Sequence, residues 1–212
     1  MKARITLILT LFTLIGFAQK KDSLVEIKFC LKTAPLYLID PFSGPCLRLG
    51  TEFKIHQNIA GYIELGGFIP DLILKNNSGF TVKLEPKVYL NKKHLCAGTY
   101  VSAELFYKYQ SYMVSDMILG AVPYSREYDV YKNVSSLIFK YGKVKIWRQR
   151  FIIDGFVGAG MRYRESSNTL TPDERMNIQY NKDHLFSRSL HRPGSYLLPT
   201  IDFGAKIGYR FK

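Results

Sequence analysis

The residue types that could carry chemistry gather between positions 165 and 195. His184 and His191 lie there, close in sequence to the carboxylates of Asp173, Glu174 and Asp183. Imidazole nitrogens and carboxylate oxygens are ordinary ligands of zinc, but zinc sites use short and regular ligand spacings, which this segment lacks. The spacing therefore favours a solvated loop, and we expect no metal ion and no cofactor.

The same segment holds the three residue types of a serine hydrolase. Ser187, His184 and Glu174 could supply a nucleophile, a base and an acid, because such a triad is defined by its geometry and not by its order in the chain. No G-x-S-x-G signature surrounds Ser187. An ester hydrolase is therefore an alternative only, and we expect no catalytic residue.

The glycines of "GFVGAG" could suggest a nucleotide site. Gly155, Gly158 and Gly160 have the reverse of the dinucleotide-binding spacing, and no helical pattern follows them. We interpret them as strand glycines, which occur where another part of the protein approaches the backbone closely.

The elements that would position all these residues are strands. The chain ends in "IDFGAKIGYRFK", where every second residue from Ile201 to Phe211 is apolar and the residues between are charged or glycine. A period of two indicates a strand with one apolar face. The same alternation predicts eight strands in all, at 24–32, 47–56, 59–69, 80–90, 95–109, 134–146, 150–164 and 201–211.

The connections between these strands alternate in length. Short breaks are predicted near 57–58, 91–94 and 147–149. Longer connections are predicted at 40–46, 70–79, 110–131 and 165–195. An even number of strands with alternating short turns and long loops is typical of a transmembrane β-barrel.

In such a barrel the apolar face lies outside and the charged face lines the interior. Eight strands leave a lumen that side chains fill, and charges inside it must pair. We therefore predict a structural charge network in the lumen, made of Arg48, Glu52, Lys83, Glu85, Asp154, Arg162, Asp202 and Lys206. On the last strand, Ala205→Lys should do more harm than Lys206→Ala, unless Lys206 is the sole partner of a buried acid.

The N-terminus has the layout of a secretory signal peptide. Lys2 and Arg4 precede an apolar run at 5–17, and cleavage is expected after Ala18. An exported chain rarely meets nucleic acid, so the net charge of +13 points to anionic envelope polymers such as lipopolysaccharide. Three cysteines, Cys30, Cys46 and Cys96, leave at least one thiol free in an oxidising compartment.

Four motifs, "LKTAPLYL", "LEPKVYL", "FVGAGMRYR" and "GAKIGYRFK", together with the signal peptide, resemble the small outer-membrane β-barrel proteins of unknown function in Gram-negative bacteria. The resemblance implies an eight-stranded antiparallel up-and-down transmembrane barrel at 19–212, after a signal peptide at 1–18. It also implies a location in the cell outer membrane. Tyr209 and Phe211 match the aromatic C-terminal signal that the insertion machinery reads, although Lys212 follows as one extra residue.

The leading functional prediction is a monomeric barrel with a structural or surface-interaction role, in contact with outer-membrane lipid and lipopolysaccharide. One alternative is an outer-membrane lipid-modifying enzyme of the lipid A deacylase kind. Another is a soluble exported barrel that binds a small apolar ligand, although the inward charges argue against an apolar lumen. The segment 110–131, rich in tyrosine and methionine, is predicted to form either a short helix or an outward strand extension, and either to bind a partner or to cover the barrel mouth.

Overall fold

The computed structural model describes residues 29–39, 44–69, 74–90, 97–120, 122–147, 150–179 and 193–211. The predicted signal peptide at 1–18 and the start of the first predicted strand lie outside the described residues. Among the described residues, no helix is long and apolar enough to cross a lipid bilayer.

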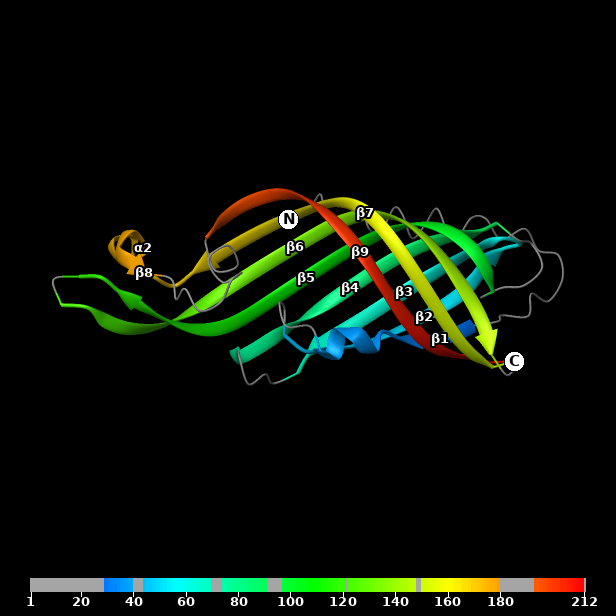
Figure 1. The fold of residues 1–212 in the computed structure, drawn as a ribbon, viewed down its shortest axis with the longest axis horizontal. Coiled ribbons are helices and arrows are strands. Elements are labelled where there is room, and N and C mark those ends of the chain that lie inside the picture. The colour runs from blue at the N-terminus through cyan, green and yellow to red at the C-terminus, as the bar shows by residue number, and fades with distance from the viewer. Residues whose placement is uncertain are drawn as a thin grey trace, which may run out of the picture.

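Eight antiparallel strands close into a ring (Figure 1). The ring order is β4-β3-β2-β1-β9-β7-β6-β5, and pairing between β4 and β5 completes it. Chain neighbours are also ring neighbours, so the predicted all-β, eight-stranded up-and-down topology is confirmed. The strands are β1 (Phe29–Thr33), β2 (Cys46–His56), β3 (Ile59–Phe68), β4 (Lys75–Tyr89), β5 (Gly98–Ile118), β6 (Tyr124–Trp147), β7 (Phe151–Asn168) and β9 (Gly194–Arg210).

The first and last strands close the ring with a regular register. Lys32 of β1 lies opposite Gly208 of β9, and Asp154 of β7 lies opposite Lys206 of β9. Side chains on one strand point alternately to the two faces, so this register places all three charged residues on the inner face. The closed ring leaves no strand edge unpaired at this seam.

Glycines on the inner face make room for large tyrosines. A Cβ atom at Gly142 would collide with the ring of Tyr100, and one at Gly50 would collide with the ring of Tyr62. Both tyrosines are fully buried in the lumen. These two glycine positions therefore allow close packing inside a narrow barrel, as a strand glycine often does.

β5 and β6 continue past the barrel as a long paired extension, at the left of Figure 1. The pairing runs without a break to Ile118 and Tyr124, so the predicted connection at 110–131 is wrong in extent and only 119–123 joins the two strands. Of the two predicted forms, the segment adopts the strand extension. Beside it, a short helix, α2 (Pro172–Asn177), leads into β8 (Ile178–Gln179), which pairs with the end of β5.

A small apolar core holds the extension together. It contains Tyr112, Ile118, Tyr128, Val130 and Leu170, each at most 3% exposed. These residues come from β5, β6 and the segment after β7, so the core ties all three together. Their burial supplies the hydrophobic stabilisation that keeps the strands paired beyond the barrel.

The helix α2 is fixed by its N-terminal cap. The Thr171 hydroxyl accepts from the Glu174 amide, and the Glu174 carboxylate accepts from the Thr171 amide at 2.8 Å, which forms a capping box. The backbone bond from Thr171 is the main cause that lowers the pKa of Glu174. Glu174, one of the candidate acids of the sequence, therefore has a structural role in this loop.

Candidate functional site: the charged barrel interior

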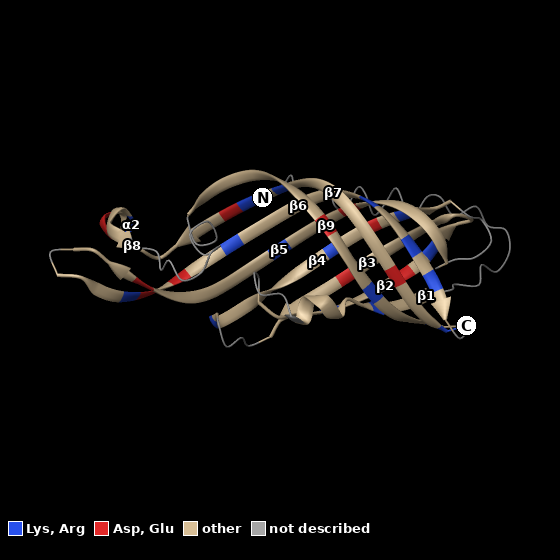
Figure 2. Ribbon diagram, in the orientation of Figure 1, with Lys and Arg blue, Asp and Glu red and all other residues tan. Residues whose placement is uncertain are grey.

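The barrel has the reverse of the polarity of a protein that folds in water. Ile201 and Phe203 on the outer face are 75% and 77% exposed. Several charged side chains on the inner face are at most 1% exposed: Lys32, Glu52, Glu64, Lys83, Glu85, Lys87, Asp154 and Lys206. Figure 2 shows the Lys and Arg positions interleaved with Asp and Glu positions across neighbouring strands of the barrel.

Four charges form the network nearest the short turns. Asp154 Oδ2 accepts from Lys32 Nζ at 2.9 Å and from Lys87 Nζ at 3.0 Å. The same two ammonium groups donate to Glu52 Oε2, at 2.7 and 3.0 Å. Two cations and two anions thus alternate in a closed square that is neutral overall, which is the arrangement that burial of charge requires.

Tyrosine hydroxyls satisfy the remaining carboxylate oxygens of this square. Tyr100 donates to Asp154 Oδ1 at 2.9 Å, and Tyr89 donates to Glu52 Oε1. Both tyrosines are at most 2% exposed. Every oxygen of the two carboxylates therefore has a donor, as buried polar groups need.

A second group surrounds Glu85. Lys206 Nζ donates to Glu85 Oε2 at 2.9 Å, and Ser102 Oγ donates to Oε1 at 2.8 Å. Lys87 lies 4.0 Å from the same carboxylate and connects this group to the square. Lys206 also lies 4.0 Å from the centre of the Tyr62 ring, so its ammonium has an aromatic face as well as an acid.

A third group lies further toward the α2 end of the barrel. Lys83 bridges Glu64 at 3.5 Å and Glu104 at 3.1 Å. Lys140 bridges Glu104 at 2.6 Å and Asp202. The three carboxylates of this group are therefore already shared between two ammonium groups.

Arg48 belongs to the same region. Its guanidinium lies 3.8 Å from Glu64 and 3.5 Å from the centre of the Tyr37 ring. Tyr37 comes from the 3-10 helix η1 (Pro35–Ile39), which follows β1. The "LKTAPLYL" motif thus places an aromatic ring inside the barrel, where it stacks on a lumen cation.

The structure places seven of the eight sequence-predicted lumen residues in ion pairs: Arg48, Glu52, Lys83, Glu85, Asp154, Asp202 and Lys206. The eighth, Arg162, is exposed and donates to Thr200 Oγ1 at 2.9 Å. Among the described residues it forms no ion pair.

The sequence prediction of this network was incomplete. Five members of the ion-pair groups were left out of it: Lys32, Glu64, Lys87, Glu104 and Lys140. The alternation of apolar and polar residues already places Lys32, Glu64, Lys87 and Glu104 on the polar faces of their strands, but it does not show which charges pair. The alternation was weak around Lys140, where Ile138 and Val144 also face inward.

The other candidate residues have different outcomes. His184, His191, Asp183 and Ser187 lie outside the described residues. Asp173 lies in α2, and Glu174 accepts from the Tyr124 hydroxyl at 3.2 Å in addition to its cap. Within the described ranges, no three His, Cys, Asp or Glu side chains are grouped so that they could hold a metal ion.

Cys30 is disulfide-bonded and Cys46 is a free, buried thiol.

The aromatic residues of the predicted insertion signal lie at the end with the short turns. Phe211 stacks on Phe29 with ring centres 4.8 Å apart and meets Tyr209 edge-on at 5.1 Å.

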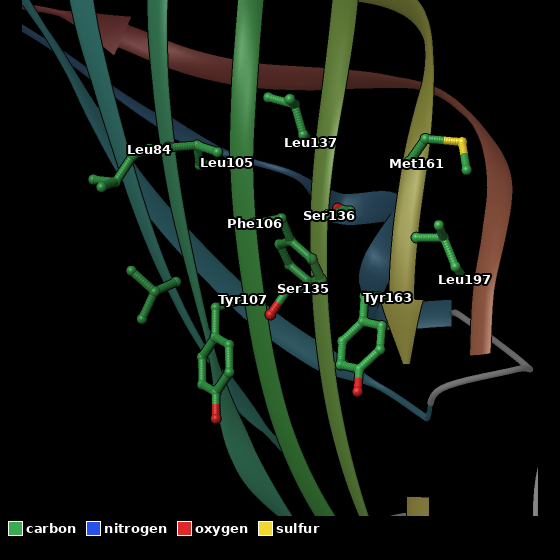
Figure 3. Close-up of a pocket in the computed structure, with 11 residues that line it drawn as sticks. Leu84, Leu105, Phe106, Tyr107, Ser135, Ser136, Leu137, Met161, Tyr163 and Leu197 are labelled. Carbon is green, nitrogen blue, oxygen red and sulfur yellow. The ribbon is translucent and has the colours of Figure 1, made fainter. Parts of the chain in front are cut away.

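The outer face carries shallow apolar hollows between the strands. One of about 380 Å³ surrounds Ser135 (Figure 3). In this view the hydroxyls of Tyr107 and Tyr163 point the same way, away from Leu105 and Leu137. Tyr107 donates to Asn133 at 3.0 Å, toward the α2 end. Tyrosines whose rings lie beside apolar side chains and whose hydroxyls point outward are typical of a membrane interface.

No protein-family model matches the chain, and no curated protein matches its sequence. Among solved structures, the chain shows a weak likeness to the N-terminal β-barrel domain of Pseudomonas aeruginosa OprF, with a TM-score of 0.36 and 7% sequence identity. The alignment covers 87% of this chain and 96% of that one. A likeness this weak establishes neither the fold nor the family of this chain. The fold therefore rests on the strand pairing, and the family resemblance stays a prediction.

Proposed function

We propose that this chain is a monomeric, non-catalytic barrel of the cell outer membrane, with a lumen closed by ion pairs and a structural or surface-interaction role. The observation that carries the proposal is the reversed polarity, with buried ammonium and carboxylate groups inside and an apolar outer face. A lipid-facing barrel needs this arrangement, because its outer side chains meet acyl chains.

A soluble barrel that binds an apolar ligand would need the opposite arrangement. Its lumen would be apolar, whereas the described lumen holds Lys32, Glu52 and Asp154 in contact with one another. In water, the exposed side chains of Ile201 and Phe203 would form part of a large apolar patch, which soluble monomers avoid. The proposed membrane location removes both difficulties.

The interaction role rests on the β5–β6 extension and α2. They lie past the barrel at the end opposite the C-terminus (Figure 1). Apolar side chains are exposed there, including Val122 and Met176, both 77% exposed. Such groups outside a membrane favour contact with lipopolysaccharide or with another envelope component.

Cell fractionation combined with a heat-shift gel tests the proposal. The expected result is recovery in carbonate-washed outer membranes, with different gel mobility before and after boiling. A urea-unfolded sample serves as the control, since it should run like the boiled form. Recovery in the soluble periplasm, with no heat-dependent shift, would contradict the membrane location.

A further inference from the structure

A polar cavity of about 190 Å³ lies on the α2 side of the ion-pair groups. Its wall includes four cations at neighbouring positions, Lys108 of β5, Lys132 of β6, and Arg162 and Arg164 of β7. Two acids, Glu104 and Asp202, also line it, but lysines already bind both of them. The cavity therefore has an excess of positive charge.

Strand register places Lys108 and Arg164 at one level of the barrel, on the two strands that flank β6. Lys108 lies opposite Val134, and Val134 lies opposite Arg164, so the three positions share one level of the barrel. Lys132 is the next inward-facing position along β6, and it is subject to the positive charges of Lys108 and Arg164. Like charges that line one cavity repel unless an anion lies between them.

Among these four cations, Lys132 is buried without an acid beside it in the described part of the chain. Its side chain is buried, with the residue only 5% exposed, and within the described residues it forms no ion pair and no hydrogen bond. Its ammonium lies 4.8 Å from the centre of the Tyr112 ring. A largely buried cation without an acid is costly, and an anion in the cavity that Lys132 lines would stabilise it.

Within the described ranges, two buried polar atoms near Lys132 also lack a hydrogen-bond partner. Ser166 lies opposite Lys132 across the β6–β7 pairing, and its buried Oγ has no partner. The buried Nε of Arg164 also has no partner, although the guanidinium lies 4.9 Å from the Tyr196 ring centre. Buried polar atoms of this kind are usually satisfied by a protein group, water or a ligand.

From this geometry we infer that the cavity binds a phosphate group, held by Lys132 and Arg164 with help from Lys108 and Arg162. The volume is several times the roughly 30 Å³ that one water occupies in the liquid, so a phosphate group fits. A tetrahedral anion accepts hydrogen bonds from several directions, which suits donors on three adjacent strands. Guanidinium groups bind two phosphate oxygens at once, and a phosphate group has further oxygens that can accept from the lysines.

The phosphate could come from a free ion or from a lipid headgroup, and a titration distinguishes these sources. The full chain, folded in a neutral detergent and shown to be closed by its heat shift, is titrated with inorganic phosphate at pH 7 and low salt by calorimetry. We expect saturable binding of one phosphate per barrel. Micelles with phosphatidic acid compete if the natural source is a lipid headgroup, and phosphatidylcholine micelles serve as the control. Absence of competition assigns the site to a free phosphate.

Three variants make the test specific. Lys132→Gln and Arg164→Gln should each weaken phosphate binding at least tenfold. Arg162→Gln changes an exposed position and should weaken it less. Lys143→Gln removes one exposed charge near the opposite end and should leave binding within twofold of the original chain.

A stability measurement separates a binding role from a structural one. Without phosphate, Lys132→Gln should raise the temperature of the heat shift, because it removes an unpaired buried charge. A lower temperature would mean that Lys132 has a structural partner. The inference is overturned by that result, by the absence of saturable binding, or by equal loss in Lys132→Gln and Lys143→Gln.

Discussion

Asp154 shows how single residues let this barrel hold charge in its interior. Its carboxylate accepts from two lysines and one tyrosine, so both oxygens are satisfied although the residue is fully buried. Taking charges out of water is costly, and only complete pairing offsets the cost. The charged residues of the lumen therefore stabilise one another. Removal of one of them should leave its partners unpaired and lower the free energy of unfolding.

We expect Asp154→Asn to destabilise the barrel strongly. The substitution keeps the shape but leaves Lys32 and Lys87 with a neutral neighbour in place of an anion. Breaking a buried pair in this way costs about 3–5 kcal/mol in the free energy of unfolding. Urea unfolding in detergent, followed by the heat-shift gel, measures this loss.

Glu127→Gln is the matched control for that variant. Glu127 pairs with Lys75 at 2.8 Å, but the two side chains are 52% and 67% exposed. An exposed pair is worth about 0–1 kcal/mol, so its loss should be small. Equal losses for the two variants would mean that water screens the lumen as it screens the surface.

For Lys206, the sequence predicts the face of the strand but not the acid that the side chain binds. The alternation of the last strand indicated its inward direction. The sequence predicts that Lys206→Ala does little harm, provided that a second cation also lies near the acid that Lys206 binds. The structure gives Glu85 two cations, Lys206 at 2.9 Å and Lys87 at 4.0 Å. Parity gives the face of a residue, whereas its partner comes from strands far away in sequence.

At the scale of elements, the sequence predicts the central parts of the strands better than their extensions. β2, β3 and β4 have regular alternation, because one face is apolar throughout the barrel. The predicted starts of β4 and β9, at residues 80 and 201, were late, since the strands begin at Lys75 and Gly194. The early parts pair with β5 and β7, but their sequences, KNNSG and GSYLLPT, do not alternate between apolar and polar residues.

The extension leads to a topology prediction for protease added to intact cells. A broad-specificity protease should cut at 119–123, which joins β5 to β6, and should spare the paired residues on either side. Val122 is 77% exposed, whereas backbone that is paired in a sheet resists cleavage. A C-terminal tag and a size standard locate the cut. Cleavage at Gln57 and Asn58 in intact cells would place the opposite end outside.

The α2 cap leads to a pH prediction. The folded pKa of Glu174 lies below its ordinary value of 4.5, mainly through the backbone bond from Thr171. The cap therefore stabilises α2 above the unfolded pKa, and this contribution is lost as the pH falls through the folded pKa. A carboxyl titration by NMR should give a lowered pKa that rises only in part in Thr171→Ala, which loses the hydroxyl bond to Glu174 but keeps the backbone amide. An unchanged pKa in that variant would remove the hydroxyl as a cause, and an ordinary pKa in the unmodified chain would contradict the cap.

At the scale of the whole molecule, the account depends on which solvent meets the outer face. Trp147 is the single tryptophan of the chain, and it is 55% exposed beside Phe151 at the end with the short turns. Phe203 lies on the same outer face, between the aromatic groups of the two barrel ends, and is 77% exposed. Tryptophan at these two positions samples the edge and the middle of the proposed lipid contact.

Quenching of tryptophan fluorescence by brominated lipids tests this contact most directly. In vesicles, Trp147 should be quenched more by bromine near the headgroup. The double variant Trp147→Phe with Phe203→Trp should be quenched more by bromine near the chain ends. Both should be poorly quenched by aqueous acrylamide. Strong acrylamide quenching at position 203, with none from either brominated lipid, would show that water meets the outer face and would contradict the membrane barrel.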